Sequence, residues 1–200
     1  MADDISISLL GPEHIKQAAR LHVAELGYSF NSQLGAEHLT RVYQAMLRLP
    51  DSYVGAAFLG DRPVGIVSGT VNAREAKRNI LRLLGWRGWA GVLRSLLLKP
   101  SLLGILLHES RLSVRIEKDG CPVEACLTAL LTSSLHRRKG VATQLVRVLE
   151  EFFLSRGISH YWLDTPSRNV AARSFYERSG FVEESQANET VVFLKQIYVR

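Results

Sequence analysis

The spacing of apolar positions along this chain predicts strands that alternate with helices. Short runs in which apolar and polar residues alternate are typical of half-buried strands, whereas apolar residues three and four apart indicate amphipathic helices. By these criteria the N-terminal part contains, in order, a strand over 5–10, a helix beginning at Gly11-Pro12-Glu13, a loop over 27–35, a helix over 36–49 and two strands over 53–59 and 64–71. Gly60-Asp61-Arg62-Pro63 joins the last two strands as a hairpin turn.

The C-terminal part continues this alternation. It predicts a central strand over 125–132, a long helix from 141 to 156, a strand over 159–165, a short helix from 169, and a final strand pair over 181–184 and 190–199 around the turn 185–188. Gly157 and Gly180 are the stop signals of the two helices. The pattern predicts a single α/β (α+β) domain over 1–200.

An insert over about 73–120 separates the two parts. It is rich in leucine, contains Trp86 and Trp89, and is interrupted by arginines and by Pro100. These interruptions exclude a spanning helix of about twenty apolar residues, so two or three short amphipathic helices are expected. They would cover a sheet face or form a dimer contact. Alternatives are a surface that contacts anionic membrane headgroups and a lid over a large or lipid-linked acceptor.

The turn Arg137-Arg138-Lys139-Gly140 is the most informative segment of the chain. It follows the central strand and opens the long helix. Positive charges are unfavourable at a helix N-terminus because the helix dipole already favours anions there. The turn therefore predicts a multiply charged anion, to which the glycine backbone can come close. The sequence contains neither a Walker loop nor a dinucleotide-binding glycine motif, so a nucleoside triphosphate or a nicotinamide cofactor is not expected.

A second motif forms the short helix from Asn169 to Gly180. Asn169 suits an N-cap position. Helical spacing places Asn169, Ala172 and Tyr176 on one face and predicts that Ala171 and Phe175 face the core. One side of the helix then presents an amide, a small residue and a phenol. Alternatively, Tyr176 is an amphipathic residue with its ring in the core.

Together these two segments resemble the GNAT superfamily of N-acetyltransferases. That family binds the acetyl-CoA pyrophosphate with R/Q-x-x-G-x-G/A after a central strand, and Arg137, Gly140 and Ala142 match this motif. Its later N-x-x-A-x-x-x-Y-x-x-x-G-F helix is matched by Asn169, Ala172, Tyr176, Gly180 and Phe181. The resemblance covers residues 124–185 and, in the order of elements alone, 1–72. It implies a mixed central sheet of about six to seven strands flanked by helices, with the helical insert between the third and fourth strands.

The resemblance also implies the residues of the site. Tyr176 would be the general acid and Glu124 a general base, while His108, Glu109 and Asp164 are other candidates for the base and His22 is an ordinary helix residue. The acceptor side would include Tyr28, Phe30 and Asn31. No metal is expected. The residues expected to bind acetyl-CoA are Leu130, Leu131, Thr132, Arg137, Arg138, Lys139, Gly140, Val141, Ala142, Thr143, Asn169, Ala172 and Tyr176.

Charge and composition agree with this interpretation. The net charge of +6 favours anionic partners such as coenzyme A. Basic residues interleaved with stacking aromatic residues are not evident, so no nucleic acid is expected. Cys121 and Cys126 resemble no zinc set and are expected to be free thiols in a reducing compartment. No basic segment precedes an apolar run at the N-terminus, which predicts a cytoplasmic location, with a peripheral position at the inner membrane face as an alternative.

Three functions remain open at this point. The leading one is an acetyl-CoA-dependent N-acetyltransferase that moves the acetyl group to a primary amine of a small molecule or amino sugar by direct attack in a ternary complex. The sparse charge among the expected acceptor residues favours this acceptor class. The second is a peptide or protein N-acetyltransferase. The third is a non-catalytic CoA-binding or membrane-associated module.

Overall fold

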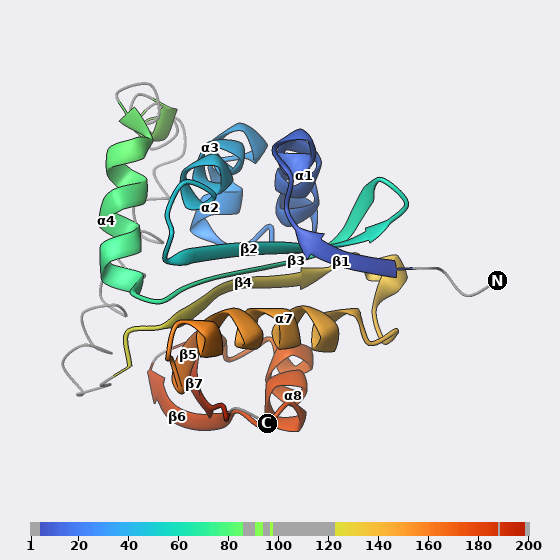
Figure 1. Ribbon diagram of the computed structural model, residues 1–200, viewed down its shortest axis with the longest axis vertical. Coiled ribbons are helices and arrows are strands. Elements are labelled where there is room, and N and C mark those ends of the chain that lie inside the picture. The colour runs from blue at the N-terminus through green and yellow to red at the C-terminus, as the bar shows by residue number, and fades with distance from the viewer. Residues whose placement is uncertain (1–4, 86–90, 94–96, 98–122, 188, 199–200) are drawn as a thin grey trace.

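The computed structural model of the protein describes residues 5–85, 91–93, 97, 123–187 and 189–198. Its centre is a seven-stranded mixed sheet with the strand order β1-β2-β3-β4-β5-β7-β6 (Figure 1). Neighbouring strands are antiparallel except for β4 and β5, which are parallel. The strands are β1 (Ile5–Leu9), β2 (Ser52–Leu59), β3 (Arg62–Thr70), β4 (Cys126–Thr132), β5 (His160–Pro166), β6 (Val182–Ala187) and β7 (Thr190–Gln196). The predicted α/β fold is confirmed.

Helices cover both faces of the sheet. Figure 1 shows α1 and α3 over one face of β2–β4 and α7 over the other, with α4 beside α3. The helices are α1 (Ile15–Glu25), α2 (Phe30–Gln33), α3 (Ala36–Met46), α4 (Ala73–Leu83), α7 (Val141–Ser155) and α8 (Val170–Arg178), with short 3-10 turns at Pro12–His14 and Ser134–His136. None of the helices in the described ranges is long and apolar enough to cross a membrane.

Two sequence predictions are corrected in detail. The segment 27–35, expected to be a loop, contains the helical turn α2, because the Ser29 hydroxyl accepts a hydrogen bond from the Ser32 amide and caps it. At the C-terminus, β6 continues to Ala187, where a turn from 185 was expected. Pairing with β7 holds this polar segment in the sheet although its side chains lack an apolar pattern.

The long helix α7 packs unusually close to β3. A Cβ atom at Gly69 would lie 2.8 Å from Leu149 Cδ1 and 3.0 Å from the Cys126 carbonyl oxygen. A Cβ atom at Gly65 would lie 3.0 Å from side-chain atoms of Leu145 and Val141. The two glycines therefore let the apolar stripe of α7 contact the sheet backbone. They set the distance between the N-terminal end of α7 and the sheet.

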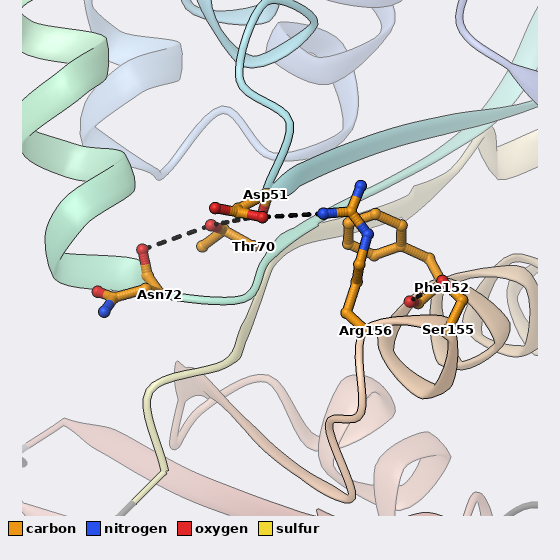
Figure 2. A network of polar contacts seen from close by, with 6 residues as sticks. All are labelled: Asp51, Thr70, Asn72, Phe152, Ser155 and Arg156. Atoms are coloured by element: carbon orange, nitrogen blue, oxygen red, sulfur yellow. Dashed lines mark hydrogen bonds and ion pairs between the residues drawn. The ribbon is translucent and has the colours of Figure 1, made fainter.

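The C-terminal end of α7 is tied to the loop before β2. Figure 2 shows the Arg156 guanidinium pointing to Asp51, with 2.9 Å between Nη1 and Oδ1. Arg156 also lies over the Phe152 ring, and Thr70 donates to the Asp51 carbonyl. Because both charged groups are well exposed, the pair contributes at most about 1 kcal/mol. Its role is to keep the end of α7 in register with the sheet.

The strands β4 and β5 separate soon after they meet. Their ladder contains the pair Cys126 and Trp162, and the Trp162 amide donates to the Ala125 carbonyl at 3.0 Å. Beyond that point the edge of β4 that faces β5 has no strand partner. A bulge at Thr128, between the pairs Ser68–Ala129 and Gly69–Leu127, further bends β4. The site is built around this opening.

The insert is described only in part. Its first helix, α4, is capped by Asn72, whose side chain accepts from the Glu75 amide at 2.9 Å. This agrees with the prediction that the insert begins with an amphipathic helix. Trp86 and Trp89, on which the membrane alternative rests, lie outside the described residues.

Candidate functional site

The basic turn folds as its sequence predicts. The helix α7 begins directly after Gly140, which has a φ of +78°, and Arg138 is also left-handed at +62°. The first hydrogen bond into the helix runs from the Gln144 amide to the Gly140 carbonyl. The helix offers no acceptor to the amides of 141–143, so these donors are available to an anion.

The side chain of Arg137 makes two hydrogen bonds within the protein. Its Nη2 donates to Glu25 Oε2 at 2.6 Å, and its Nε donates to the Thr132 carbonyl at 3.3 Å. Both bonds hold the guanidinium against the protein. Arg137 therefore braces the turn through its side chain.

The open edge of β4 lies next to this turn. The Ser133 amide donates to the Val64 carbonyl in β3 at 2.8 Å. Because successive residues of a strand direct their amides to opposite edges, Leu131 also faces β3, whereas Leu130 and Thr132 face the opening. Of the three expected backbone contacts, Leu130 and Thr132 are thus placed for a ligand. Thr132 Oγ1 and His136 Nδ1 are buried polar atoms that lack a partner within the described chain.

Tyr176 is buried on α8. The Asn169 side chain caps this helix by accepting from the Ala172 amide at 3.2 Å, and Gly180 ends it with a φ of +83°. The Tyr176 ring is 7% exposed and packs against Phe181 and Phe193. Burial, followed by the charges of Tyr28, Asp164 and Cys126, raises the pKa of the Tyr176 phenol well above its usual value. The phenol is therefore a neutral donor at physiological pH.

The expected orientation of α8 is corrected by this arrangement. Ala171 is exposed, Phe175 packs against the core as expected but is half-buried, and Tyr176 is the buried residue of the helix. The reason is that β7 and the Phe181 ring cover the face that carries Tyr176. The Tyr176 ring thus lies in the core, as the alternative interpretation of an amphipathic residue predicts, whereas its hydroxyl lies close to polar groups.

The three expected acceptor residues diverge in the structure. Tyr28 lies near Asn169, Asp164 and Arg168, and burial raises the pKa of its phenol. Phe30 is buried in α2, and Asn31 is bonded to His38 of α3 at 3.2 Å. Tyr28 is therefore the member of this group that reaches Tyr176 and Asn169.

The candidate bases also occupy different places. Glu124 precedes β4, is exposed and accepts from Asn72 Nδ2 at 2.7 Å. Asp164 lies on β5 and acts electrostatically on both Tyr28 and Tyr176. His22 is buried and bonded to the Tyr43 hydroxyl, in agreement with its expected structural role. His108 and Glu109 lie outside the described residues. The structure favours Asp164 over Glu124 as the carboxylate nearest to the phenols.

Sequence reasoning missed two features of the site. The first is Glu25, whose carboxylate reaches Ser134 and Arg137. The second is Thr128, which the bulge turns outward and whose hydroxyl is 2.8 Å from that of Ser68. No spacing rule could have found these contacts, because they join residues 109, 112 and 60 positions apart.

Comparisons with known proteins agree with this geometry. Residues 110–181 match the model of the acetyltransferase (GNAT) family. The structure is similar to the PaiA N-acetyltransferase of Thermoplasma acidophilum in complex with coenzyme A, with 14% identity, a TM-score of 0.63, and 97% of this chain and 99% of that chain covered. No curated protein matches the sequence.

Two further solved structures have the same fold. One is an acetyltransferase of the GNAT family from Streptococcus pneumoniae, with 16% identity, a TM-score of 0.59, and 97% of this chain and 100% of that chain covered. The other is the ribosomal-protein-S18-alanine N-acetyltransferase of Escherichia coli, with 13% identity, a TM-score of 0.58, and 98% and 96% covered. Residues 110–181 thus match the GNAT acetyltransferase family model, and the chain has the fold of these structures.

Proposed function

We propose that the protein is an acetyl-CoA-dependent N-acetyltransferase that acts on a primary amine of a small molecule or amino sugar. The observation that carries the proposal is the left-handed Gly140 turn at the start of α7, directly beside the open edge of β4. The turn offers amide donors to a pyrophosphate, and the strand edge offers backbone groups to an extended, amide-containing arm.

The residues of the site fit coenzyme A in four ways. The amides of Val141, Ala142 and Thr143 suit pyrophosphate oxygens. The backbone of Leu130 and Thr132 at the open edge suits the pantetheine amides. Thr132 Oγ1 is a buried hydroxyl without a partner in the described chain, and a ligand on that edge would satisfy it. Arg138 and Lys139 add positive charge at the rim of the turn.

Bound acetyl-CoA would supply a thioester whose acetyl group is transferred to the amine. The neutral Tyr176 phenol is suited to donate a proton to the departing sulfur. Asp164 is suited to accept a proton from the amine, directly or through water, and Glu124 is the alternative carboxylate. Tyr28 and Asn169, which lie near each other, would orient the acceptor beside the phenol.

The first test is calorimetric titration of acetyl-CoA into the wild type, Gly140→Glu and Gly157→Glu. Gly140 and Gly157 lie at opposite ends of α7, have φ values of +78° and +72°, and both have open space where a Cβ atom would lie. The backbone strain of the two variants is therefore matched. Micromolar binding that is lost in Gly140→Glu and kept in Gly157→Glu supports the proposal, whereas equal affinities in the two variants contradict the assigned turn.

A peptide or protein amine is the second candidate for the acceptor. It is favoured by one observation: the fold is shared with an N-acetyltransferase whose acceptor is a ribosomal protein. Release of the CoA thiol, measured against amino sugars, small amines and N-terminal peptides in parallel, separates the two acceptor classes. Binding of acetyl-CoA without thiol release on any acceptor would favour the non-catalytic module.

A further inference from the structure

Glu25 contacts the basic turn through both of its carboxylate oxygens. Oε1 accepts from the Ser134 amide at 2.9 Å, and Oε2 accepts from Arg137 Nη2 at 2.6 Å. The Glu25 side chain is 13% exposed, so this carboxylate is largely withdrawn from water. Arg137 in turn donates to the Thr132 carbonyl at the end of β4. One carboxylate thereby sets the path of the chain from β4 to α7.

Glu25 is also the last residue of α1, and the segment 26–34 follows it directly. This segment, here called the acceptor segment, is held together by its own hydrogen bonds. The Ser29 amide donates to the Leu26 carbonyl at 3.0 Å, and Gln33 Nε2 donates to the Gly27 carbonyl at 2.9 Å. It is therefore a compact unit and moves with the end of α1 to which it is attached.

The far side of the acceptor segment contacts α8. Tyr28 lies near the Asn169 side chain, which caps the first turn of α8. The acceptor segment thus follows Glu25, which is bonded to the basic turn, and lies beside the Tyr176 helix at Tyr28.

We propose that Glu25 is a positioning residue that couples ligand binding at the amides of 141–143, directly after the basic turn, to the order of the acceptor segment (26–34). The inference rests on the proposed function, because the ligand of the turn is taken to be the pyrophosphate of coenzyme A. Ligand bonds to the amides of 141–143 fix the chain that precedes them, and with it Arg137 and Ser134. Their bonds to Glu25 then fix the end of α1 and the segment that begins there.

Hydrogen exchange measures this coupling without knowledge of the acceptor. Coenzyme A is added to the wild type, Glu25→Gln, Arg137→Ala and the double variant, and exchange is followed in peptides over 26–34 and 134–143. Glu25→Gln keeps the shape of the side chain and an acceptor for the Ser134 amide. Glu37→Gln is the matched control, because Glu37 makes an ion pair of the same 2.6 Å length with Arg41 but is 83% exposed and remote from the turn.

In the wild type and in Glu37→Gln, coenzyme A is expected to slow exchange in both segments. In Glu25→Gln and Arg137→Ala, it slows exchange over 134–143 but no longer over 26–34, and its dissociation constant rises about three- to tenfold, as for the loss of one ordinary hydrogen bond. The double variant should behave like either single variant, because both remove the same link.

Two outcomes would overturn the inference, and they are distinguishable. If coenzyme A binds the wild type but leaves 26–34 unchanged, or still slows 26–34 in Glu25→Gln, Glu25 does not couple the two segments and the proposed function stands. If coenzyme A does not bind the wild type at all, the proposed function fails and the coupling fails with it.

Discussion

At the scale of single residues, the surroundings of two buried tyrosines distinguish a candidate catalytic phenol from a structural one. Tyr161 and Tyr176 are both buried tyrosines in the same core. The Tyr161 hydroxyl donates to Glu150 at 2.7 Å, and Lys195 binds the same carboxylate oxygen. That phenol is a structural link between α7, β5 and β7. Tyr176 lies instead beside Tyr28 and Asp164 at the opening of the sheet.

This difference gives a prediction for two matched substitutions. Tyr176→Phe should lower kcat about 10²- to 10⁴-fold, because the proton donor for the leaving thiolate is lost, with little change in acetyl-CoA affinity. Tyr161→Phe should lower stability by about 1–2 kcal/mol, because Glu150 loses a hydrogen bond, and should keep kcat. Steady-state kinetics and urea unfolding of both variants test this, and a normal kcat in Tyr176→Phe would remove Tyr176 from the mechanism.

A second prediction at this scale concerns His22. Burial lowers the pKa of its imidazole from 6.5 to about 4 in the folded protein. Between these values the unfolded chain binds the proton more readily, so the free energy of unfolding falls as the pH is lowered through this window. The full effect is about 3 kcal/mol. Urea unfolding at pH 7 and pH 4.5 should show a smaller loss for His22→Gln than for the wild type; parallel losses would contradict the assignment.

At the scale of elements, the contact of α7 with β3 sets the position of the basic turn. The two glycines of β3 allow this contact. Gly69 has the less room for a side chain, because a backbone carbonyl oxygen lies 3.0 Å from the position that a Cβ atom would take. A backbone atom in a paired strand cannot move aside as a flexible side chain can. The height of α7 over the sheet, and with it the turn at its N-terminus, therefore depends on glycine at this position.

Gly69→Ala should therefore destabilise the protein by about 1–3 kcal/mol through overpacking. The matched control is Val182→Ala on β6, where the side chain is 67% exposed and the change should stay within about 0.5 kcal/mol. Chemical unfolding of the two variants is the measurement. If Gly69→Ala were as stable as the wild type, α7 would have room to lift from the sheet, and the close contact would not be what fixes the turn.

At the scale of the whole molecule, the net charge of +6 is matched to an anionic ligand. The field of an exposed positive surface is screened over about 8 Å at physiological ionic strength. Acetyl-CoA affinity is therefore expected to fall as salt is raised from about 20 mM to about 500 mM, whereas the affinity for pantetheine, which lacks the phosphates, should change little. Calorimetric titrations at both salt concentrations test this. Equal salt dependence of the two ligands would mean that the charged groups of the turn do not contact phosphate.

Much of the site could be predicted because it depends on local interactions. The turn at Gly140, the start of α7 and the caps of α8 at Asn169 and Gly180 lie where the sequence places them. Each is determined within a few residues: a glycine adopts a positive φ, and an asparagine side chain bonds an amide three positions later. The same holds for the strands, whose apolar pattern reports which faces are buried.

The rest was decided by tertiary structure, for a physical reason. The separation of β4 from β5, the bulge at Thr128 and the link from Glu25 to Arg137 depend on contacts between segments far apart in the chain. The burial of Tyr176 depends on β7 and Phe181, which follow it. The sequence by itself therefore determined the elements and the chemistry available at their ends. Packing determined which of those ends meet, because the energy of such contacts belongs to the pair and not to either segment.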